Sequence, residues 1–145
     1  MKLLALLLLS APAFAQSVIQ TDSLPVINAA PGVTLRELSG KTVPPDARSD
    51  KVSVAWFRLE PGKASAWSHN KLGEESFFVL SGEGEVWTGS KVQPVRAGSY
   101  IVIQPATVRS IRASKGVPLE FYAITSPAWS SDDDVLTTAP AGAPK

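Results

Sequence analysis

The segment WSHNKLGEESFFVLSG, Trp67–Gly82, holds the residues of this chain whose types and spacing could do chemistry. It contains His69, the only histidine, and the adjacent carboxylates Glu74 and Glu75. Imidazole and carboxylate groups are common protein ligands of transition metals. A metal site is therefore the first hypothesis, and it depends on whether further ligands stand at the right spacing.

Short strands are the elements that must position this segment. Twelve prolines and ten glycines interrupt the chain, and short runs rich in β-branched and aromatic residues lie between them. This spacing predicts strands over residues 52–59, 76–80, 85–88, 100–103 and 119–125. No long helical pattern separates these runs, so βαβ units are not expected. The fold class is therefore all-β, a sandwich or a barrel.

From Pro61 to Gly82 the chain resembles the first motif of the cupin superfamily, G-x5-H-x-H-x3/4-E-x6-G. Gly62, Glu75 and Gly82 occupy the first glycine, the glutamate and the last glycine of that motif. The resemblance implies a single-domain, double-stranded β-helix, which is a jelly-roll barrel with one open mouth. Fold alone does not define function, because this fold supports many chemistries.

A second block, residues 98–113, is similar to the second cupin motif, G-x5-P-x-G-x2-H-x3-N. Gly98 fits its first position, and Pro105 stands one residue later than the motif's proline. The resemblance covers the chain from about Val52 to Pro127, which is most of the domain.

The metal hypothesis fails when the family's ligand positions are carried over one by one. The two histidines of the first motif fall on Ser68 and Asn70, the glutamate is Glu75, and the last histidine falls on Arg109. Hydroxyl and amide groups are poor ligands for zinc, iron or copper, and a guanidinium stays protonated with no lone pair to give. We therefore expect no metal ion and no other cofactor.

His69 lies between two of these positions. Side chains alternate between the faces of a strand, so His69 points outward if Ser68 and Asn70 point into the barrel. It is then a surface or subunit-contact residue, and the alternative is a proton carrier at the mouth, since its ordinary pKa lies near 6.5.

Glu75 and Arg109 are predicted to form an ion pair inside the barrel, because the resemblance brings their motif positions together. Arginine should keep Glu75 ionised and lower its pKa, which makes it a weak base. Two interpretations stay open. The pair either neutralises two buried groups, or Arg109 retains donors for a ligand's carboxylate, phosphate or carbonyl.

Further inward residues follow from alternation along the strand, with Phe77 on the face of Glu75. Ser76 and Phe78 then lie on the opposite face, and Glu74 points to solvent. An aromatic wall with a few polar groups suits a small organic ligand or a sugar ring, although Phe77 could be core alone. The candidate ligand-binding residues are Trp67, Ser68, Asn70, Phe77, Trp87, Tyr100, Gln104 and Tyr122.

The first fifteen residues have the layout of a secretory signal peptide. A positive start precedes an apolar run and small residues, so cleavage is expected after Ala15 and the protein should be periplasmic or secreted. The run is too short to span a bilayer. The mature chain divides into an N-terminal arm with the first strands (16–50), a cupin core (51–129) and a C-terminal turn with a mobile tail (130–145). Within the last part, Ser130–Asp134 could cap a helical turn.

Charge and composition limit the partners. Loss of the signal peptide leaves 13 positive and 13 negative side chains, and a neutral chain offers no broad field for nucleic acid or anionic membrane. Cysteine is absent, so no disulfide supports the fold.

Three functions remain open. The first is a secreted module that binds a small polar ligand, a carbohydrate or an organic acid. The second is a metal-independent isomerase, epimerase or lyase, with Glu75 as base and Arg109 as stabiliser of negative charge. The third is a structural homodimer with a vestigial pocket, paired through sheet edges with the help of the outward Phe78 face.

Overall fold

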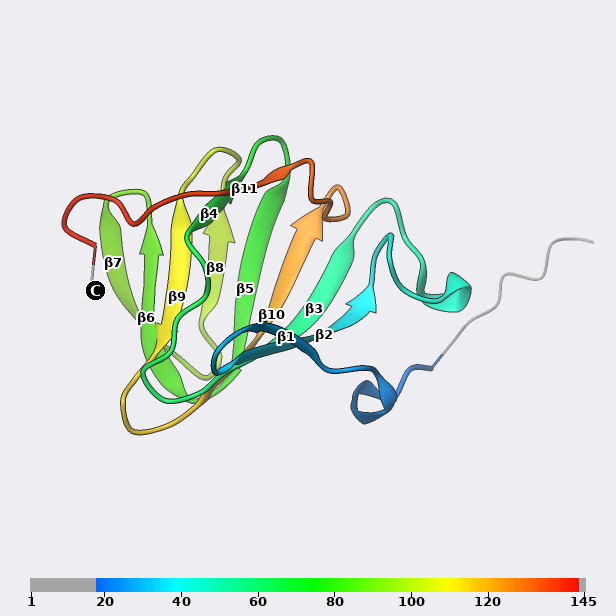
Figure 1. Ribbon diagram of the computed structural model, residues 1–145, viewed down its shortest axis with the longest axis horizontal. Helices are drawn as coiled ribbons and strands as arrows, with labels where there is room; N and C mark the ends of the chain where they lie inside the picture. Colours follow the sequence, from blue (N-terminus) through cyan, green and yellow to red (C-terminus); the bar gives the residue numbers. More distant parts are fainter. Residues whose placement is uncertain (1–17, 144–145) are drawn as a thin grey trace, which may run out of the picture.

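Two antiparallel β-sheets pack face to face in the computed structural model, which describes residues 18–143 (Figure 1). The expected signal peptide, residues 1–15, lies outside the described residues. Helix is limited to two short 3-10 turns, η1 (Thr21–Ser23) and η2 (Pro45–Ala47). Within residues 18–143 no helix has the length and apolarity needed to cross a membrane.

The larger sheet has six strands, which follow the spatial order β1-β2-β3-β10-β5-β8. Their bounds are β1 (Ile27–Ala30), β2 (Val33–Ser39), β3 (Ser53–Leu59), β10 (Leu119–Ser126), β5 (Glu74–Ser81) and β8 (Tyr100–Ile103).

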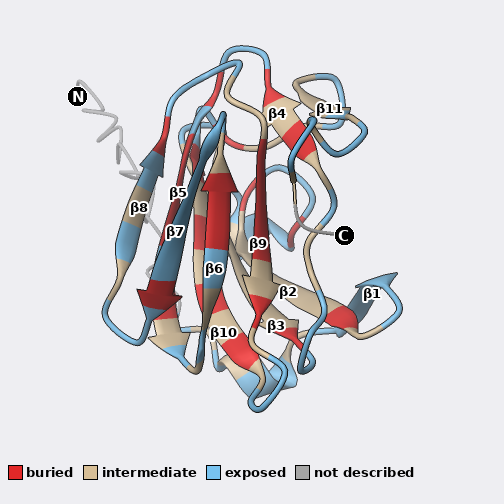
Figure 2. Cartoon of the chain, turned by 90° about the vertical axis from the view of Figure 1, so that its left-hand side faces the viewer, coloured by how far each residue is buried: buried red, intermediate tan, exposed pale blue. Residues whose placement is uncertain are grey.

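The smaller sheet has five strands in the order β11-β4-β9-β6-β7. Their bounds are β11 (Asp134–Leu136), β4 (Ser68–Asn70), β9 (Arg109–Ala113), β6 (Glu83–Thr88) and β7 (Lys91–Arg96). In Figure 2, buried positions concentrate on β9 and β6 inside this sheet, whereas the edge strands β1 and β8 are largely exposed.

All five predicted strands are present, as β3, β5, β6, β8 and β10. The single turn predicted at Ser130–Asp134 is present, and it is not continued as a helix. The backbone N–H groups of Asp133 and Asp134 both donate to the Ser130 carbonyl at 3.1 Å, which closes a tight turn. The chain then continues as β11, because pairing with β4 satisfies its backbone groups.

The hydrophobic core lies between the sheets and is filled by large side chains at one end. Along β10 the inward residues run from Leu119 and Phe121 to Ala123 and Thr125, so they become smaller and then polar. The neighbouring strand β3 repeats this change, from Leu59 through the inward positions of residues 57, 55 and 53. Because the paired inward residues of these two neighbouring strands are small at the polar end, space remains between the sheets there.

Candidate functional site

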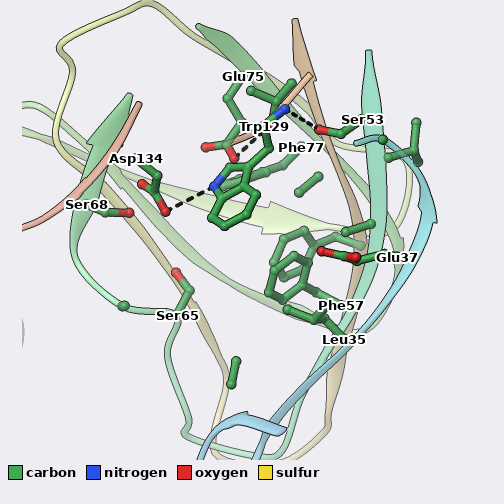
Figure 3. A pocket seen from close by; sticks show the side chains of 18 of the residues that line it. Leu35, Glu37, Ser53, Phe57, Ser65, Ser68, Glu75, Phe77, Trp129 and Asp134 are labelled. Carbon is green, nitrogen blue, oxygen red and sulfur yellow. Dashed lines mark hydrogen bonds between the residues drawn. The ribbon is translucent and has the colours of Figure 1, made fainter. Parts of the chain in front are cut away.

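A cavity of about 270 Å³ occupies this space between the sheets. Its polar end is formed by Ser68, Glu75, Arg109 and Asp134, and its walls are mainly apolar. The apolar lining includes Val33, Leu35, Phe57, Phe77 and Phe121. Figure 3 shows the labelled polar side chains Ser68, Glu75 and Asp134 and the rings of Phe57 and Phe77 around a common space.

Strand pairing brings the polar residues together from five strands. Ser68 of β4 pairs with Arg109 of β9, and Asn70 of β4 pairs with Asp134 of β11. Directly paired residues of antiparallel strands project to the same face of their sheet. On the opposite sheet Glu75 of β5 pairs with Thr125 of β10 and faces this group across the barrel.

The predicted ion pair between Glu75 and Arg109 is confirmed. Arg109 Nε donates to Glu75 Oε2, and only 7% of each side chain is exposed. Arg109 Nη1 also donates to Ser68 Oγ at 2.5 Å and to Asp134 Oδ1 at 3.3 Å. Its Nη2 donates to Asn70 Oδ1 at 3.4 Å. One cation thus lies between two carboxylates and is held by protein groups on every nitrogen.

Burial raises the pKa of Glu75 above its ordinary value of 4.5. The charge of Arg109 and its hydrogen bond oppose this effect, whereas the charge of Asp134 adds to it. The lowered pKa expected from the sequence is therefore wrong in direction, because burial in a site from which water is largely excluded outweighs the attraction of Arg109, and the charge of Asp134 adds to the effect of burial.

Trp129 extends the network toward the apolar wall. Its indole Nε1 donates to Asp134 Oδ2 at 3.3 Å, and its backbone N–H donates to Ser53 Oγ at 3.0 Å (Figure 3). The adjoining Asp133 carboxylate accepts hydrogen bonds from the backbone N–H groups of Leu72 (2.8 Å) and Gly73 (3.0 Å). These bonds connect the segment before β11 to β3 and to the loop between β4 and β5.

Of the residues predicted for the site, four line the cavity, namely Ser68, Glu75, Phe77 and Arg109. Asn70 is buried behind them and contacts Arg109. His69 is half-buried and outside the lining, as alternation along the strand predicts. Glu74 is exposed and hydrogen-bonds Gln104, also as expected for an outward residue.

The other five candidates lie away from the cavity, contrary to the expectation that they line it. Trp67 and Trp87 form an edge-to-face pair, with ring centroids 5.7 Å apart, around a separate small hollow. Tyr100 is 60% exposed on the outer face of β8 and donates to Ser76 Oγ at 3.0 Å. Gln104 is exposed, and Tyr122 pairs with the outward Phe78. None of these five side chains faces the cavity, whereas phenylalanine and alanine side chains of β3, β5 and β10 do.

The lining residues that sequence reasoning missed include Glu37, Trp129 and Asp134. Glu37 could have been found, because it is one of the alternate residues of β2, with Val33, Leu35 and Ser39, and all four line the cavity. Trp129 and Asp134 reach the cavity because the chain folds back and pairs with β4 as β11. No periodic pattern in the sequence predicts this reversal.

The donor set at the polar end does not fit a transition metal. Within residues 18–143, His, Cys, Asp and Glu side chains nowhere form a group of three or more suited to a metal ion. At the position where the family's last histidine would stand, the Arg109 guanidinium contacts Glu75, Ser68 and Asn70. A fixed positive charge there repels a cation and cannot coordinate one.

Two antiparallel sheets enclosing one polar-ended cavity define a small barrel of the jelly-roll type. A family model for the cupin domain matches residues 55–125. The chain therefore belongs to the cupin superfamily.

Solved structures share this fold at low sequence identity. The polyketide cyclase RemF from Streptomyces resistomycificus is similar with a TM-score of 0.70 and 14% identity, covering 88% of this chain and 89% of its own. KdgF from Halomonas sp. is similar with a TM-score of 0.69 and 13% identity, and the match covers 81% of this chain and 98% of KdgF. A cupin-2 domain from Rhodospirillum rubrum has a TM-score of 0.66 and 21% identity, and the match covers 86% of this chain and 82% of that domain's chain. A comparison with curated proteins found no match. At these identities the likeness shows the fold alone.

Proposed function

We propose that this protein is a secreted or periplasmic cupin that binds a small organic molecule in its cavity without a metal ion. One observation carries the proposal. The space that ends at Glu75 and Arg109 is walled by apolar and aromatic side chains, and small residues on β3 and β10 keep it open. An apolar cavity with a few convergent polar groups is the usual form of a ligand site.

The size of the cavity limits the ligand. A volume of about 270 Å³ lies just below the usual range for ligand pockets, which begins at about 300 Å³, so the ligand should be small. Of the two ligand classes expected from the sequence, an organic acid suits this cavity less well. The nitrogens of Arg109 already bind Glu75, Ser68, Asp134 and Asn70. Hydroxyl groups of a carbohydrate-like molecule can instead bond to the serine and carboxylate oxygens.

A thermal-shift screen tests binding. A library of small sugars, polyols, acids and amines is applied to the wild type and to Ala55→Leu, which fills the cavity from β3. A ligand of the folded state raises the Tm by mass action. We expect compounds that stabilise the wild type and lose this effect in Ala55→Leu. Ala97→Leu is the matched control, because Ala97 is exposed and lies outside the lining. A library without any such compound would contradict the proposal.

A metal-independent isomerase, epimerase or lyase is the second candidate, and the raised pKa of Glu75 favours it. A carboxyl group with a raised pKa is a stronger base when ionised, and it holds a proton closer to neutral pH. A ligand found in the screen would be incubated with the wild type and with Glu75→Gln. Conversion by the wild type alone supports catalysis, whereas binding without conversion supports a binding protein.

Secretion is proposed from residues 1–15, which end in small residues. Expression of the full chain in a Gram-negative host, followed by mass spectrometry of the periplasmic fraction, should find a protein that begins at Gln16. An uncleaved protein in the cytoplasmic fraction would reject this part of the proposal.

The outward face of the larger sheet supports a homodimer. Phe78, Tyr100 and Val102 are 38%, 60% and 50% exposed, and Phe78 pairs directly with Tyr100. Apolar residues gathered on an exposed sheet face favour self-association. Sedimentation should find a dimer that Phe78→Lys weakens, and a wild-type monomer at high protein concentration would reject the pairing.

A further inference from the structure

The charges that face the cavity are mostly negative. Three carboxylates line it, those of Glu37, Glu75 and Asp134, against the two cations Arg109 and Lys41. Arg109 is engaged by Glu75 and Asp134, and Lys41 is exposed to solvent. Of the three carboxylates of the lining, that of Glu37 is the one that forms no ion pair within residues 18–143.

Glu37 lies in the cavity because of its register on the larger sheet. One row of paired inward residues crosses four strands and reads Glu37, Ala55, Ala123, Phe77. The two alanines keep the space open between the carboxylate and the Phe77 ring. The Glu37 carboxylate accepts a hydrogen bond from Thr42 Oγ1 at 2.6 Å. In the described part of the chain no arginine, lysine or histidine forms an ion pair with it.

The next row brings aromatic rings beside this carboxylate. Phe57 and Phe121 are paired neighbours on β3 and β10, and their rings stack with centroids 5.2 Å apart. Phe77 contacts Phe121 at 5.0 Å. Figure 3 shows Trp129, Asp134, Phe57 and Glu37 among the side chains around this cavity, with the Trp129 indole bonded to Asp134.

Aromatic faces and unpaired carboxylates together recognise organic cations. The negative face of an aromatic ring attracts an ammonium group, and the attraction is strongest where water is excluded. A half-buried carboxylate without a cationic partner retains attraction for a positive ligand, whereas the guanidinium of the lining is already engaged by protein groups and only the exposed Lys41 is left to attract an anion.

We infer that the ligand of this cavity is a small organic cation, with an amine or ammonium group held among Glu37, Phe57 and Trp129 and an uncharged part directed toward the polar end. This inference rests on the proposed function, because it names the chemical class of the molecule that the same cavity binds.

Three probes of nearly the same shape separate charge from size. Choline carries a positive charge, dimethylbutanol is its neutral carbon isostere, and dimethylbutyrate is an anion of similar bulk. Isothermal titration calorimetry of the full mature chain at fixed salt measures each. We expect choline to bind at least about tenfold tighter than dimethylbutanol, and the anion to bind weakest.

Variants locate the effect. Glu37→Gln should weaken choline about tenfold and leave dimethylbutanol unchanged, because only the charge is lost. Glu83→Gln removes the same charge from an exposed position outside the cavity and should change neither probe. Trp129→Leu should weaken choline more than dimethylbutanol.

Equal binding of choline and dimethylbutanol, tightest binding of the anion, or failure of choline to bind would each overturn the inference. A neutral or anionic ligand that is lost in Ala55→Leu leaves the proposed function standing. That function fails separately, when no compound of the wider library distinguishes wild type from Ala55→Leu.

Discussion

The Arg109 guanidinium donates to the Glu75 carboxylate at the polar end of the cavity, with 7% of either side chain exposed. Asp134 contacts the same guanidinium from β11 at 3.3 Å and is more accessible, with 19% of its side chain exposed. The arginine therefore joins both sheets and the C-terminal strand at one point. Its loss has structural as well as electrostatic consequences.

Removal of the arginine should destabilise the fold strongly. Arg109→Met leaves the buried Glu75 carboxylate without its counter-charge, and breaking a buried pair on one side costs about 3–5 kcal/mol. The double variant Arg109→Met/Glu75→Gln should recover part of this loss. Urea unfolding at neutral pH measures both.

The matched control for this experiment is Arg58→Met. Arg58 also bridges two carboxylates, Glu60 and Glu120, but 35% of its side chain is exposed. Exposed pairs contribute at most about 1 kcal/mol, so the control should change stability little. Equal losses of unfolding free energy in Arg58→Met and Arg109→Met would show that the buried network stabilises the fold no more than an exposed ion pair does.

Glu75 should give the protein a pH-dependent stability of unusual sign. Because its pKa is raised in the folded state, the folded protein binds this proton more tightly than the unfolded chain does. Its contribution to the free energy of unfolding therefore falls as the pH rises from about 4.5 toward the folded-state pKa. Glu75→Gln lacks this fall.

The measurement is the difference in unfolding free energy between wild type and Glu75→Gln from pH 4 to 8. We expect the wild type to lose stability relative to the variant as the pH rises. A relative gain would mean that Arg109 dominates burial and that the pKa of Glu75 is lowered, as the sequence alone suggested.

Metal affinity should appear when the charge of Arg109 is removed and imidazoles are supplied. Ser68, Asn70 and Arg109 surround Glu75, so Ser68→His/Asn70→His/Arg109→His creates three imidazoles and a carboxylate. After dialysis against zinc, elemental analysis should find one zinc per chain in this triple variant and none in the wild type.

The double variant Ser68→His/Asn70→His is the control, because it retains the guanidinium. It should bind zinc far more weakly than the triple variant. Stoichiometric zinc in the wild type would reverse the interpretation of the site, and equal affinity of double and triple variants would show that Arg109 does not exclude the metal.

The fold and part of the site could be predicted from the sequence, because both depend on local patterns. Turn residues bound five strands, and motif spacing placed Glu75 and Arg109 together. Chain reversal after Trp129 could not be predicted, since the three pairs between β11 and β4 depend on contacts distant in sequence. The predicted direction of the Glu75 pKa shift was wrong for the same reason, since neither the depth of burial nor the nearby Asp134 could be known from the sequence.

The aromatic wall shows a different limit. The sequence favoured Trp and Tyr for the cavity because each carries a polar handle, but Trp67, Trp87, Tyr100 and Tyr122 lie elsewhere. The aromatic residues that β3, β5 and β10 contribute to the lining are phenylalanines, which have no polar atom to satisfy, and the one lining tryptophan, Trp129, donates its indole N–H to Asp134. The faces of individual residues followed from strand register, which composition does not fix.

Two glycines of the cupin motifs should differ sharply in their tolerance of a side chain. Gly82 and Gly98 both have positive φ angles, +81° and +85°. A Cβ at Gly82 would lie 2.0 Å from the Pro118 carbonyl oxygen, whereas nothing lies within 4 Å of one at Gly98. Alanine at Gly98 therefore costs only the left-handed backbone strain, about 1–2 kcal/mol.

Gly82→Ala adds a backbone collision to the same strain, since the turn between β5 and β6 must move away from the start of β10. We expect a loss of unfolding free energy at least about twice that of Gly98→Ala. Urea denaturation of the two variants measures the difference, with Gly98→Ala as the matched control for backbone strain. Similar losses in both would mean that the close approach of Gly82 to Pro118 does not constrain this turn.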